Sequence, residues 1–327
     1  MTMPVTAILA AMPFSMMPAY AGAIATFTLT NPNRIAVDVS GAAELSEFSS
    51  SVAPGLTVII PPAQFRAEPP KRRYEVTAPI KSSGTKRLPQ ISGPVDSSLP
   101  LVVIDAGHGG HDPGAISPHS GSREKDITLA IAKTVRDELL KSGRVRVALT
   151  RDQDAFLVLQ DRYGIARRMN ADLFISIHAD SADNQDASGG TVYTLSEVAS
   201  DREAQRLASR ENKSDIINGV NLGGADAHVS SILIDLTQRE TMNVSADFAK
   251  LLLREARPNM PLRFNSHRFA SFIVLKAPDT PSVLFETGYV SNVSDVAFLS
   301  SPEGQQKVGR SVASAIQVHF ARRLASR

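Results

Sequence analysis

LVVIDAGHGGHDPGA, residues 101–115, is the stretch on which the fold prediction rests. Its first four residues are apolar, which is typical of a buried strand. The strand runs into a turn where three glycines surround His108, and glycine lets the backbone adopt positive φ and approach a ligand closely. A histidine placed there is suited to metal binding or catalysis, although an ordinary loop histidine fits this stretch alone equally well.

Beyond this stretch the sequence alternates between strand and helix patterns. Apolar runs predict strands, and apolar residues at helical spacing predict amphipathic helices. The predicted strands are 145–149, 173–178, 190–195, 271–275 and 282–285, and the predicted helices are 126–142, 157–169 and 303–323. This alternation predicts an α/β fold, a mostly parallel twisted sheet with helices on both faces. Such sheets bind ligands at the carboxyl ends of their strands.

Composition narrows the chemistry that this fold can carry. The 327 residues are 43% hydrophobic with a net charge of +2, which gives no electrostatic reason to expect nucleic acid as a partner. Because there is no cysteine, a metal site has to use His, Asp and Glu. No run after the N-terminal segment approaches the roughly 18 apolar residues of a membrane span, so we expect no transmembrane segment.

Three segments precede the predicted α/β domain, which we place at 101–327. Residues 1–22 are apolar and end in a small-x-small pattern typical of a signal peptide, although no Lys or Arg precedes the apolar run. We therefore expect export, with a short buried helix or a misassigned start as alternatives. Residues 23–62 predict a small β unit, and the proline-rich, basic residues 63–100 predict an extended linker. The strands expected in the β unit are 27–29, 35–39 and 56–60.

Four polar residues lie where chemistry is expected in the predicted sheet. His108 follows the first strand, His178 ends LFISIH, and Glu286 follows SVLF. If these strands are parallel, the three side chains share one rim, and the loop after His108 is long enough to return Glu124 to it. Two histidines and a carboxylate form a common catalytic Zn²⁺ set, and a second carboxylate can act as general base.

The motifs IDAGHGGHDPGA, SREKDITLAIA, LFISIHAD and VLKAPDTPSVLFETGYVSN, in this order, resemble the zinc-dependent N-acetylmuramoyl-L-alanine amidases. The resemblance implies that His108, Glu124 and His178 hold one zinc ion and that Glu286 is the catalytic carboxylate. It implies hydrolysis, by zinc-activated water, of the amide between the lactyl group of N-acetylmuramic acid and L-alanine in peptidoglycan. Asp180 and Asn292 would support the site, unless they only form turns.

A second, shorter resemblance concerns the N-terminal part of the chain. FTLTNPNRIAVDVSG, residues 27–41, is similar to the end of an AMIN domain, a module that places some cell-wall amidases in the envelope. The stretch is too short for a whole domain, so it implies a truncated module. With the predicted signal, the resemblance implies a periplasmic enzyme of wall remodelling and daughter-cell separation.

Residues 196–266 predict an insertion between core strands, with helices at 200–214 and 230–253. Some amidases of this family carry an insertion here as a lid, and one of its carboxylates fills the fourth zinc position until an activator protein moves it. Glu203 and Glu211 are the candidates, and the alternative is that both are surface charges, with Glu203 in a capping pattern after Ser200. The resemblance thus implies a periplasmic activator that acts on this insertion.

Other interpretations of the sequence stay open. His111 and His267 are candidates for substrate contact, but a structural role fits them as well. A zinc peptidase or a deacetylase would use the same chemistry on another amide. An inactive wall-binding regulator would keep the fold without the reaction, although the presence of all four chemical residues favours an enzyme. Fe(II) also suits two histidines and a carboxylate, so the sequence does not fix the metal.

Overall fold

The computed structural model describes residues 24–31, 34–40, 72–77, 88–213 and 230–325. The chain divides into two compact units, Met1–Ala78 and Pro79–Arg327. The predicted signal segment 1–22 and the predicted strand 56–60 lie outside the described residues. Among the helices that are described, none combines the length and the hydropathy needed to cross a membrane.

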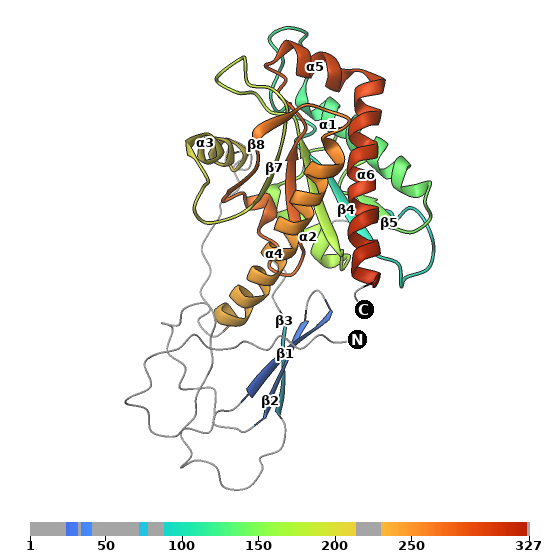
Figure 1. The fold of residues 1–327 in the computed structure, drawn as a ribbon, viewed down its shortest axis with the longest axis vertical. Helices are drawn as coiled ribbons and strands as arrows, with labels where there is room; N and C mark the ends of the chain where they lie inside the picture. The colour runs from blue at the N-terminus through green and yellow to red at the C-terminus, as the bar shows by residue number, and fades with distance from the viewer. Residues whose placement is uncertain (1–23, 32–33, 41–71, 78–87, 214–229, 326–327) are drawn as a thin grey trace. The chain divides into compact units, whose positions relative to one another are not determined.

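A six-stranded sheet with the order β5-β4-β6-β9-β7-β8 forms the centre of the second unit (Figure 1). Four neighbouring strands are parallel, β7 pairs antiparallel with β9, and the edge strand β8 is parallel to β7. The strands are β4 (Leu101–Ala106), β5 (Arg146–Leu149), β6 (Leu173–His178), β7 (Gly190–Leu195), β8 (Leu262–Ala270) and β9 (Ser282–Glu286). This mostly parallel sheet confirms the predicted fold class.

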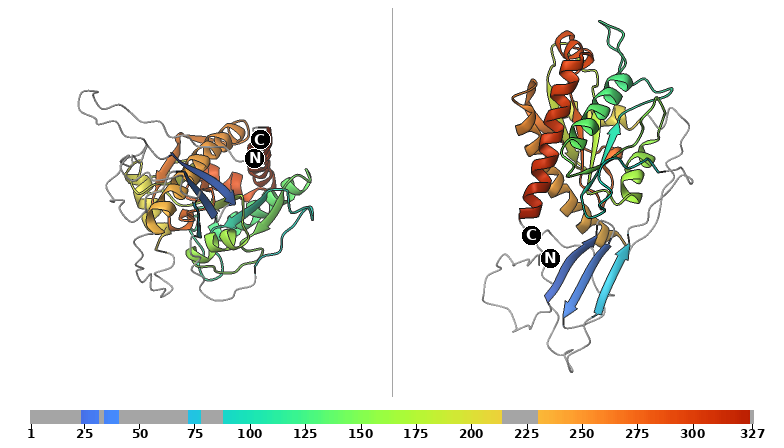
Figure 2. Two further views of the ribbon diagram at one scale, coloured as in Figure 1. Left: turned by 90° about the horizontal axis from the view of Figure 1, so that it is seen from below. Right: turned by 90° about the vertical axis from the view of Figure 1, so that its right-hand side faces the viewer.

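Helices cover both faces of the sheet, as Figures 1 and 2 show. One face carries α1 (Glu124–Leu140), α4 (Ser230–Ala256) and α6 (Pro302–Ala325), with α5 (Val293–Ser300) beside α6. The other carries α2 (Leu159–Arg168), α3 (Arg202–Glu211) and the 3₁₀ turn η4 (Ile273–Leu275). Successive residues of a strand point to opposite faces, so Phe174 enters the second apolar cluster and Ile175 the first. Burial on both sides explains why β6 is almost wholly apolar.

One predicted strand is wrong. The stretch 271–275 contains the 3₁₀ turn η4, and the edge strand precedes it at Leu262–Ala270. Strand β8 has an irregular register, since its partner on β7 moves only from Gly190 to Val192 while β8 advances from Leu262 to His267. This bulge interrupts the alternation of apolar and polar residues that marks a strand, so the sequence LRFNSHRFA does not show the usual strand pattern.

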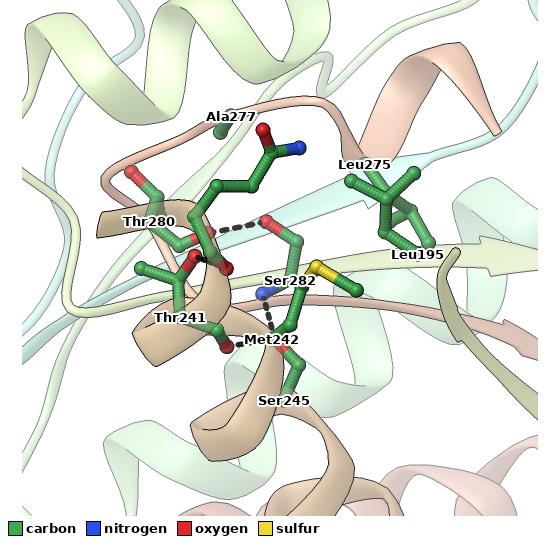
Figure 3. Close-up of a pocket in the computed structure, with 9 residues that line it drawn as sticks. Leu195, Thr241, Met242, Ser245, Leu275, Ala277, Thr280 and Ser282 are labelled. Atoms are coloured by element: carbon green, nitrogen blue, oxygen red, sulfur yellow. Dashed lines mark hydrogen bonds between the residues drawn. The ribbon is translucent and has the colours of Figure 1, made fainter. Parts of the chain in front are cut away.

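Helix α4 belongs to the core, although it lies within the predicted insertion 196–266. Its residues Phe248, Ala249 and Leu252 are fully buried in the first apolar cluster. Beside a small pocket, hydrogen bonds through the hydroxyl of Ser245 connect α4 to β9 (Figure 3). Ser245 Oγ accepts from Ser282 N at 2.8 Å and donates to the Thr241 carbonyl at 2.6 Å. Only part of the range 196–266 therefore lies outside the core, and α4 supports the strand that carries Glu286.

The first unit contains a three-stranded antiparallel sheet with the order β1-β2-β3. Its strands are β1 (Ile24–Asn31), β2 (Arg34–Ser40) and β3 (Arg72–Thr77), and the first two form the predicted hairpin. Strand β3 falls within 63–100, the range predicted as a linker. Tyr74 and Val76 alternate with charged residues in RRYEVT, a strand pattern that a prediction based on charge and proline content overlooks.

A buried carboxylate at the end of β4 connects this strand to β6, to α2 and to the residue that follows β5. Asp105 Oδ1 accepts from Thr150 Oγ1 at 2.6 Å and from Arg162 Nη1 at 3.0 Å, and its Oδ2 accepts from Ser176 Oγ at 2.7 Å. Burial by itself would raise the pKa of Asp105, but the charge of Arg162 and the hydroxyl hydrogen bonds outweigh it and hold that pKa below its usual value. Asp105 is thus ionised at neutral pH in the folded protein.

Asp105→Asn is expected to lower the free energy of unfolding by about 3–5 kcal/mol, because it leaves the buried charge of Arg162 without its partner. The folded-state pKa lies below the unfolded value of about 4, so the contribution of Asp105 is present at neutral pH and declines as the pH falls below about 4. Urea unfolding between pH 3 and 7 measures both effects. The exposed Asp137→Asn is the matched control, and equal losses for the two variants would contradict this account.

Candidate metal centre

The glycine turn after β4 carries His108 in a left-handed backbone conformation. The φ angles are 60° at His108, 128° at Gly109 and 62° at Gly110. A left-handed non-glycine residue costs about 1–2 kcal/mol, so the surroundings must hold it in place. Two buried arginines do so: Arg162 Nη2 donates to the His108 carbonyl at 2.9 Å, and Arg151 Nη2 donates to the Gly107 carbonyl at 2.9 Å.

Glu124, the first residue of α1, lies between the two histidines. One carboxylate oxygen is 3.2 Å from His108 Nε2, and the other is 3.2 Å from His178 Nδ1. Each oxygen also accepts a backbone hydrogen bond of 2.9 Å, from Ala115 N and Ala179 N respectively. The loop after His108 therefore returns the carboxylate to the rim, as the sequence predicted.

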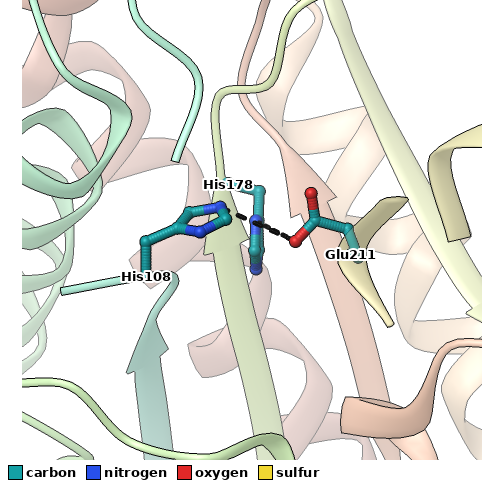
Figure 4. A group of neighbouring side chains, drawn as sticks. All are labelled: His108, His178 and Glu211. Carbon is teal, nitrogen blue, oxygen red and sulfur yellow. Dashed lines mark ion pairs between the residues drawn. The ribbon is translucent and has the colours of Figure 1, made fainter. Parts of the chain in front are cut away.

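A second carboxylate reaches the histidines from α3. One ligand atom from each of His108, His178 and Glu211 lies within 4.8 Å of the other two (Figure 4). Glu211 Oε2 is 3.6 Å from His108 Nε2 and 3.4 Å from His178 Nδ1. All three side chains are buried, and they come from the carboxyl ends of two strands and one helix. This group could bind a metal ion.

The charges and the hydrogen bonds of the group fit a cation. His108 Nε2 is buried and has no hydrogen-bond partner among the described residues, while Asp112 Oδ2 contacts His108 Nδ1 at 2.9 Å and orients the ring. Burial would lower the pKa of His108, but the charges of Glu124 and Glu211 and the contact with Asp112 outweigh it and raise that pKa. Three carboxylates around two imidazoles leave an excess of negative charge that a divalent cation would neutralise.

Glu286 stands next to His178, because these residues are partners in the parallel register of β9 and β6. Its Oε2 accepts from Asp180 N at 3.0 Å, and its buried Oε1 has no hydrogen-bond partner among the described residues. Burial raises the pKa of Glu286 well above its usual range, and the charges of Asp180, Glu124 and Glu211 raise it further. A carboxyl group with a raised pKa can both take up and release a proton near neutral pH.

Helix α3 is attached at both ends. At its carboxyl end Arg210 pairs with Asp180 and donates to the Ser181 carbonyl at 2.8 Å. At its amino end Glu203 pairs with Arg263 and lies 3.0 Å from Arg268 Nη1. Of the two glutamates predicted as candidates for the fourth ligand position, Glu203 and Glu211, only Glu211 therefore lies at the histidines. The helix is capped by Asp201, whose side chain accepts from Ala204 N, and not by the predicted Ser200.

Three other candidate residues make contacts within the fold. His111 stacks on Phe156 with ring centroids 4.3 Å apart, and His267 Nε2 lies 3.2 Å from Thr194 Oγ1. Neither belongs to the metal-binding group found among the described residues. Asn292 caps α5 by accepting from Ser294 N and Asp295 N, which is the turn-forming role that the sequence left open.

Four supporting residues were missed in the sequence. Asp112 follows His108 by four positions in the glycine turn, so an acidic residue close to a candidate ligand was an available signal. Arg151, Arg162 and Arg210 act across long sequence separations, and no local pattern marks them.

The fold and the site together define an α/β protein with a buried centre of histidines and carboxylates at the carboxyl ends of parallel strands. Residues 102–318 match the Amidase_3 family, described as N-acetylmuramoyl-L-alanine amidase, and the chain belongs to this family. The family predicted from the sequence motifs is thereby confirmed.

Two relatives and one solved structure show how far the similarity extends. The chain is 39% identical to the amidase AmiC of Escherichia coli O6:H1 over 222 residues, which are 68% of this chain and 53% of that protein. It is 38% identical to AmiA of Escherichia coli K12, over 67% of this chain and 76% of that protein. The chain thus spans about half the length of the first relative. The structure of the amidase Ami1 from Mycobacterium smegmatis matches with a TM-score of 0.51 at 20% identity, covering 68% of this chain and 97% of that one, and supports the fold alone.

Proposed function

We propose that this protein hydrolyses the amide bond between the lactyl group of N-acetylmuramic acid and L-alanine in peptidoglycan, with one zinc ion. One observation carries the proposal: the group of His108, His178 and Glu124 lies beside Glu286 at the carboxyl ends of β4, β6 and β9. Membership of the amidase family supports the choice of this amide over the bond that a zinc peptidase or a deacetylase would cleave.

His108, Glu124 and His178 would hold the zinc ion. The buried Nε2 of His108, which faces carboxylate oxygens without a well-directed hydrogen bond, and the surplus of carboxylates support this assignment. When bound, zinc would polarise the lactyl carbonyl and lower the pKa of a coordinated water to about 7. Asp112 keeps the His108 ring oriented through its contact with Nδ1.

Glu286 is the proton-transfer group in this proposal. Its Oε1 is available to accept the proton of the attacking water, while the Asp180 N–H holds Oε2 in position. The raised pKa lets the protonated carboxyl group persist until the amine of L-alanine leaves, and the proton then passes to that amine.

Glu211 keeps the enzyme inactive in this proposal. Its carboxylate lies at both histidines and would take the ligand position that water needs. Release requires α3 to move, since Glu211 is its last residue. We assign this displacement to a periplasmic activator protein acting on the outer part of the segment 196–266.

The location follows from the substrate. Peptidoglycan lies outside the inner membrane, so we place the enzyme in the periplasm, exported by the segment 1–22. The AMIN-like stretch within 23–62 would assist its placement in the envelope during wall remodelling and daughter-cell separation.

A digest of purified peptidoglycan by the full chain carrying Glu211→Ala, which removes the proposed inhibitory carboxylate, tests the proposal. We expect stem peptides with a free L-alanine amine, identified by mass spectrometry. A chelator such as 1,10-phenanthroline should reduce their release at least a hundredfold, because the open ligand position and the polarised carbonyl are lost together. Added Zn²⁺ should restore it. Release that is unaffected by the chelator, or cleavage at another amide, would contradict the proposal.

A further inference from the structure

Two arginines on the edge strand β8 both pair with the carboxylate of Glu203 on α3. Arg263 pairs with Glu203 Oε1, and Arg268 Nη1 lies 3.0 Å from Glu203 Oε2. Arg263 Nη1 also donates to Tyr289 Oη at 2.9 Å, and its guanidinium lies 5.5 Å from the centre of the Tyr289 ring. The glutamate thus occupies a small cationic site walled by an aromatic ring.

Arg268 is held by carboxylates of α3 and its cap. The residue is only 8% exposed, its Nη1 faces Glu203 and its Nε lies 3.3 Å from Asp201 Oδ2, yet neither nitrogen makes a well-directed hydrogen bond among the described residues. The neighbouring Tyr193 hydroxyl is also buried without a well-directed partner. A buried guanidinium is costly unless carboxylates engage it, and here Glu203 and Asp201, both at the amino end of α3, do so.

The cationic site lies close to the reaction centre. Leu262, next to Arg263, pairs with Gly190, and the following residue Thr191 pairs with Glu286. Arg268 pairs with Tyr193. Tyr193 follows Thr191 by two residues on β7 and therefore lies about 7 Å from it along the strand. Both arginines pair with Glu203 of α3, so movement of the helix would take this partner away from them.

Helix α3 presents two carboxylates with a fixed spacing. Glu211 lies at the histidines and Glu203 at the arginines, and eight residues of helix separate them by about 12 Å. An extended peptide covers that distance in about three to four residues. A free carboxylate on the third residue of a stem peptide would therefore lie about where Glu203 lies, with the scissile amide at the metal centre.

We propose that Arg263 and Arg268 form a subsite for the free carboxylate of the third stem-peptide residue, and that Glu203 occupies this subsite while α3 is closed. The assignment deepens the proposed amidase function and rests on it. Displacement of α3 removes Glu203 and leaves the two arginines without this partner. The substrate carboxylate then takes the place of Glu203 as the negative charge and the acceptor for the two arginines. The enzyme should therefore prefer wall peptides whose third residue carries a free carboxylate, because an amidated third residue offers no negative charge to Arg263 and Arg268.

The test uses the Glu211→Ala variant of the full chain and three muramyl tripeptides. One carries free carboxylates, one is amidated on the second residue, and one is amidated on the third. Amidation of the third residue should lower kcat/KM about tenfold or more, and amidation of the second less than twofold. Arg268→Gln should lower kcat/KM for the free substrate by the same factor and abolish the preference. Arg263→Gln, at the less buried arginine, gives an independent second variant.

The matched control is Arg206→Gln, which removes an arginine of α3 from an exposed pair with Asp183 and should change neither value. Calorimetric titration of the same variants with the free and amidated tripeptides measures Kd without turnover. If hydrolysis is absent but Kd keeps the order, the amidase proposal fails and the subsite stands. Equal Kd for the free and amidated peptides, a preference that persists in Arg268→Gln, or a preference for the second carboxylate would overturn the subsite.

Discussion

Glu286→Gln is expected to lower kcat by a factor of about 10²–10⁴, because the side chain that moves the proton is lost while its shape is kept. Glutamine has nearly the volume of glutamate, and its amide oxygen can still accept from Asp180 N, so the position of the side chain is retained. Peptidoglycan hydrolysis by a variant relieved of Glu211 measures the effect.

Metal content separates this role from that of a ligand. Because His108, Glu124 and His178 would hold the ion, Glu286→Gln should retain about one zinc per chain. Glu303→Gln, at an exposed glutamate of α6, is the matched control and should leave kcat unchanged. If Glu286→Gln keeps more than a tenth of the activity, or loses its zinc, the assignment of Glu286 as general base is wrong.

Glu211→Ala should raise the basal rate of hydrolysis about 10- to 100-fold. Removing a carboxylate contact worth about 1.4–2.8 kcal/mol shifts the population toward the open site by that factor. Alanine also leaves α3 without its contact to His108 and His178, so the carboxyl end of the helix should detach more readily. Hydrolysis of a soluble muramyl peptide without any activator gives the basal rate.

The comparison with Glu197→Ala makes the test specific, since Glu197 is an exposed glutamate just before α3. Its substitution should leave the basal rate unchanged. A second measurement is hydrogen exchange of the α3 amides, which should be faster in Glu211→Ala. An unchanged basal rate with faster exchange would mean that α3 opens without limiting the reaction, and the inhibitory role of Glu211 would be rejected.

The sequence was most informative where one short segment contains both a core strand and a candidate metal ligand. A strand that ends in a glycine turn places His108 at the carboxyl edge of a sheet, and two further strands place His178 and Glu286 at the same edge. Parallel pairing then brings these residues together whatever the details of the loops. Even Glu124 was predictable, because the length of its loop permits the return.

The sequence was least informative where contacts join distant segments. Glu203 and Glu211 lie on the same polar helix, and the sequence does not show which one reaches the histidines. Two contacts between distant segments decide it. The arginines of β8 pair with Glu203, and Asp180 pairs with Arg210, the neighbour of Glu211. The strand β8 itself was missed because its bulge and its charged edge disturb the two-residue period.

The segment just before β4 determines how the domain can be shortened. Ser92 and Val147 exchange backbone hydrogen bonds of 2.7 and 2.9 Å, and Arg146 donates to the Leu99 carbonyl, so residues 92–99 cover the outer side of β5. A fragment that starts at Leu101 would uncover this strand and invite intermolecular strand pairing. Such a fragment would self-associate and precipitate at concentrations where one that starts near Leu88 stays monomeric.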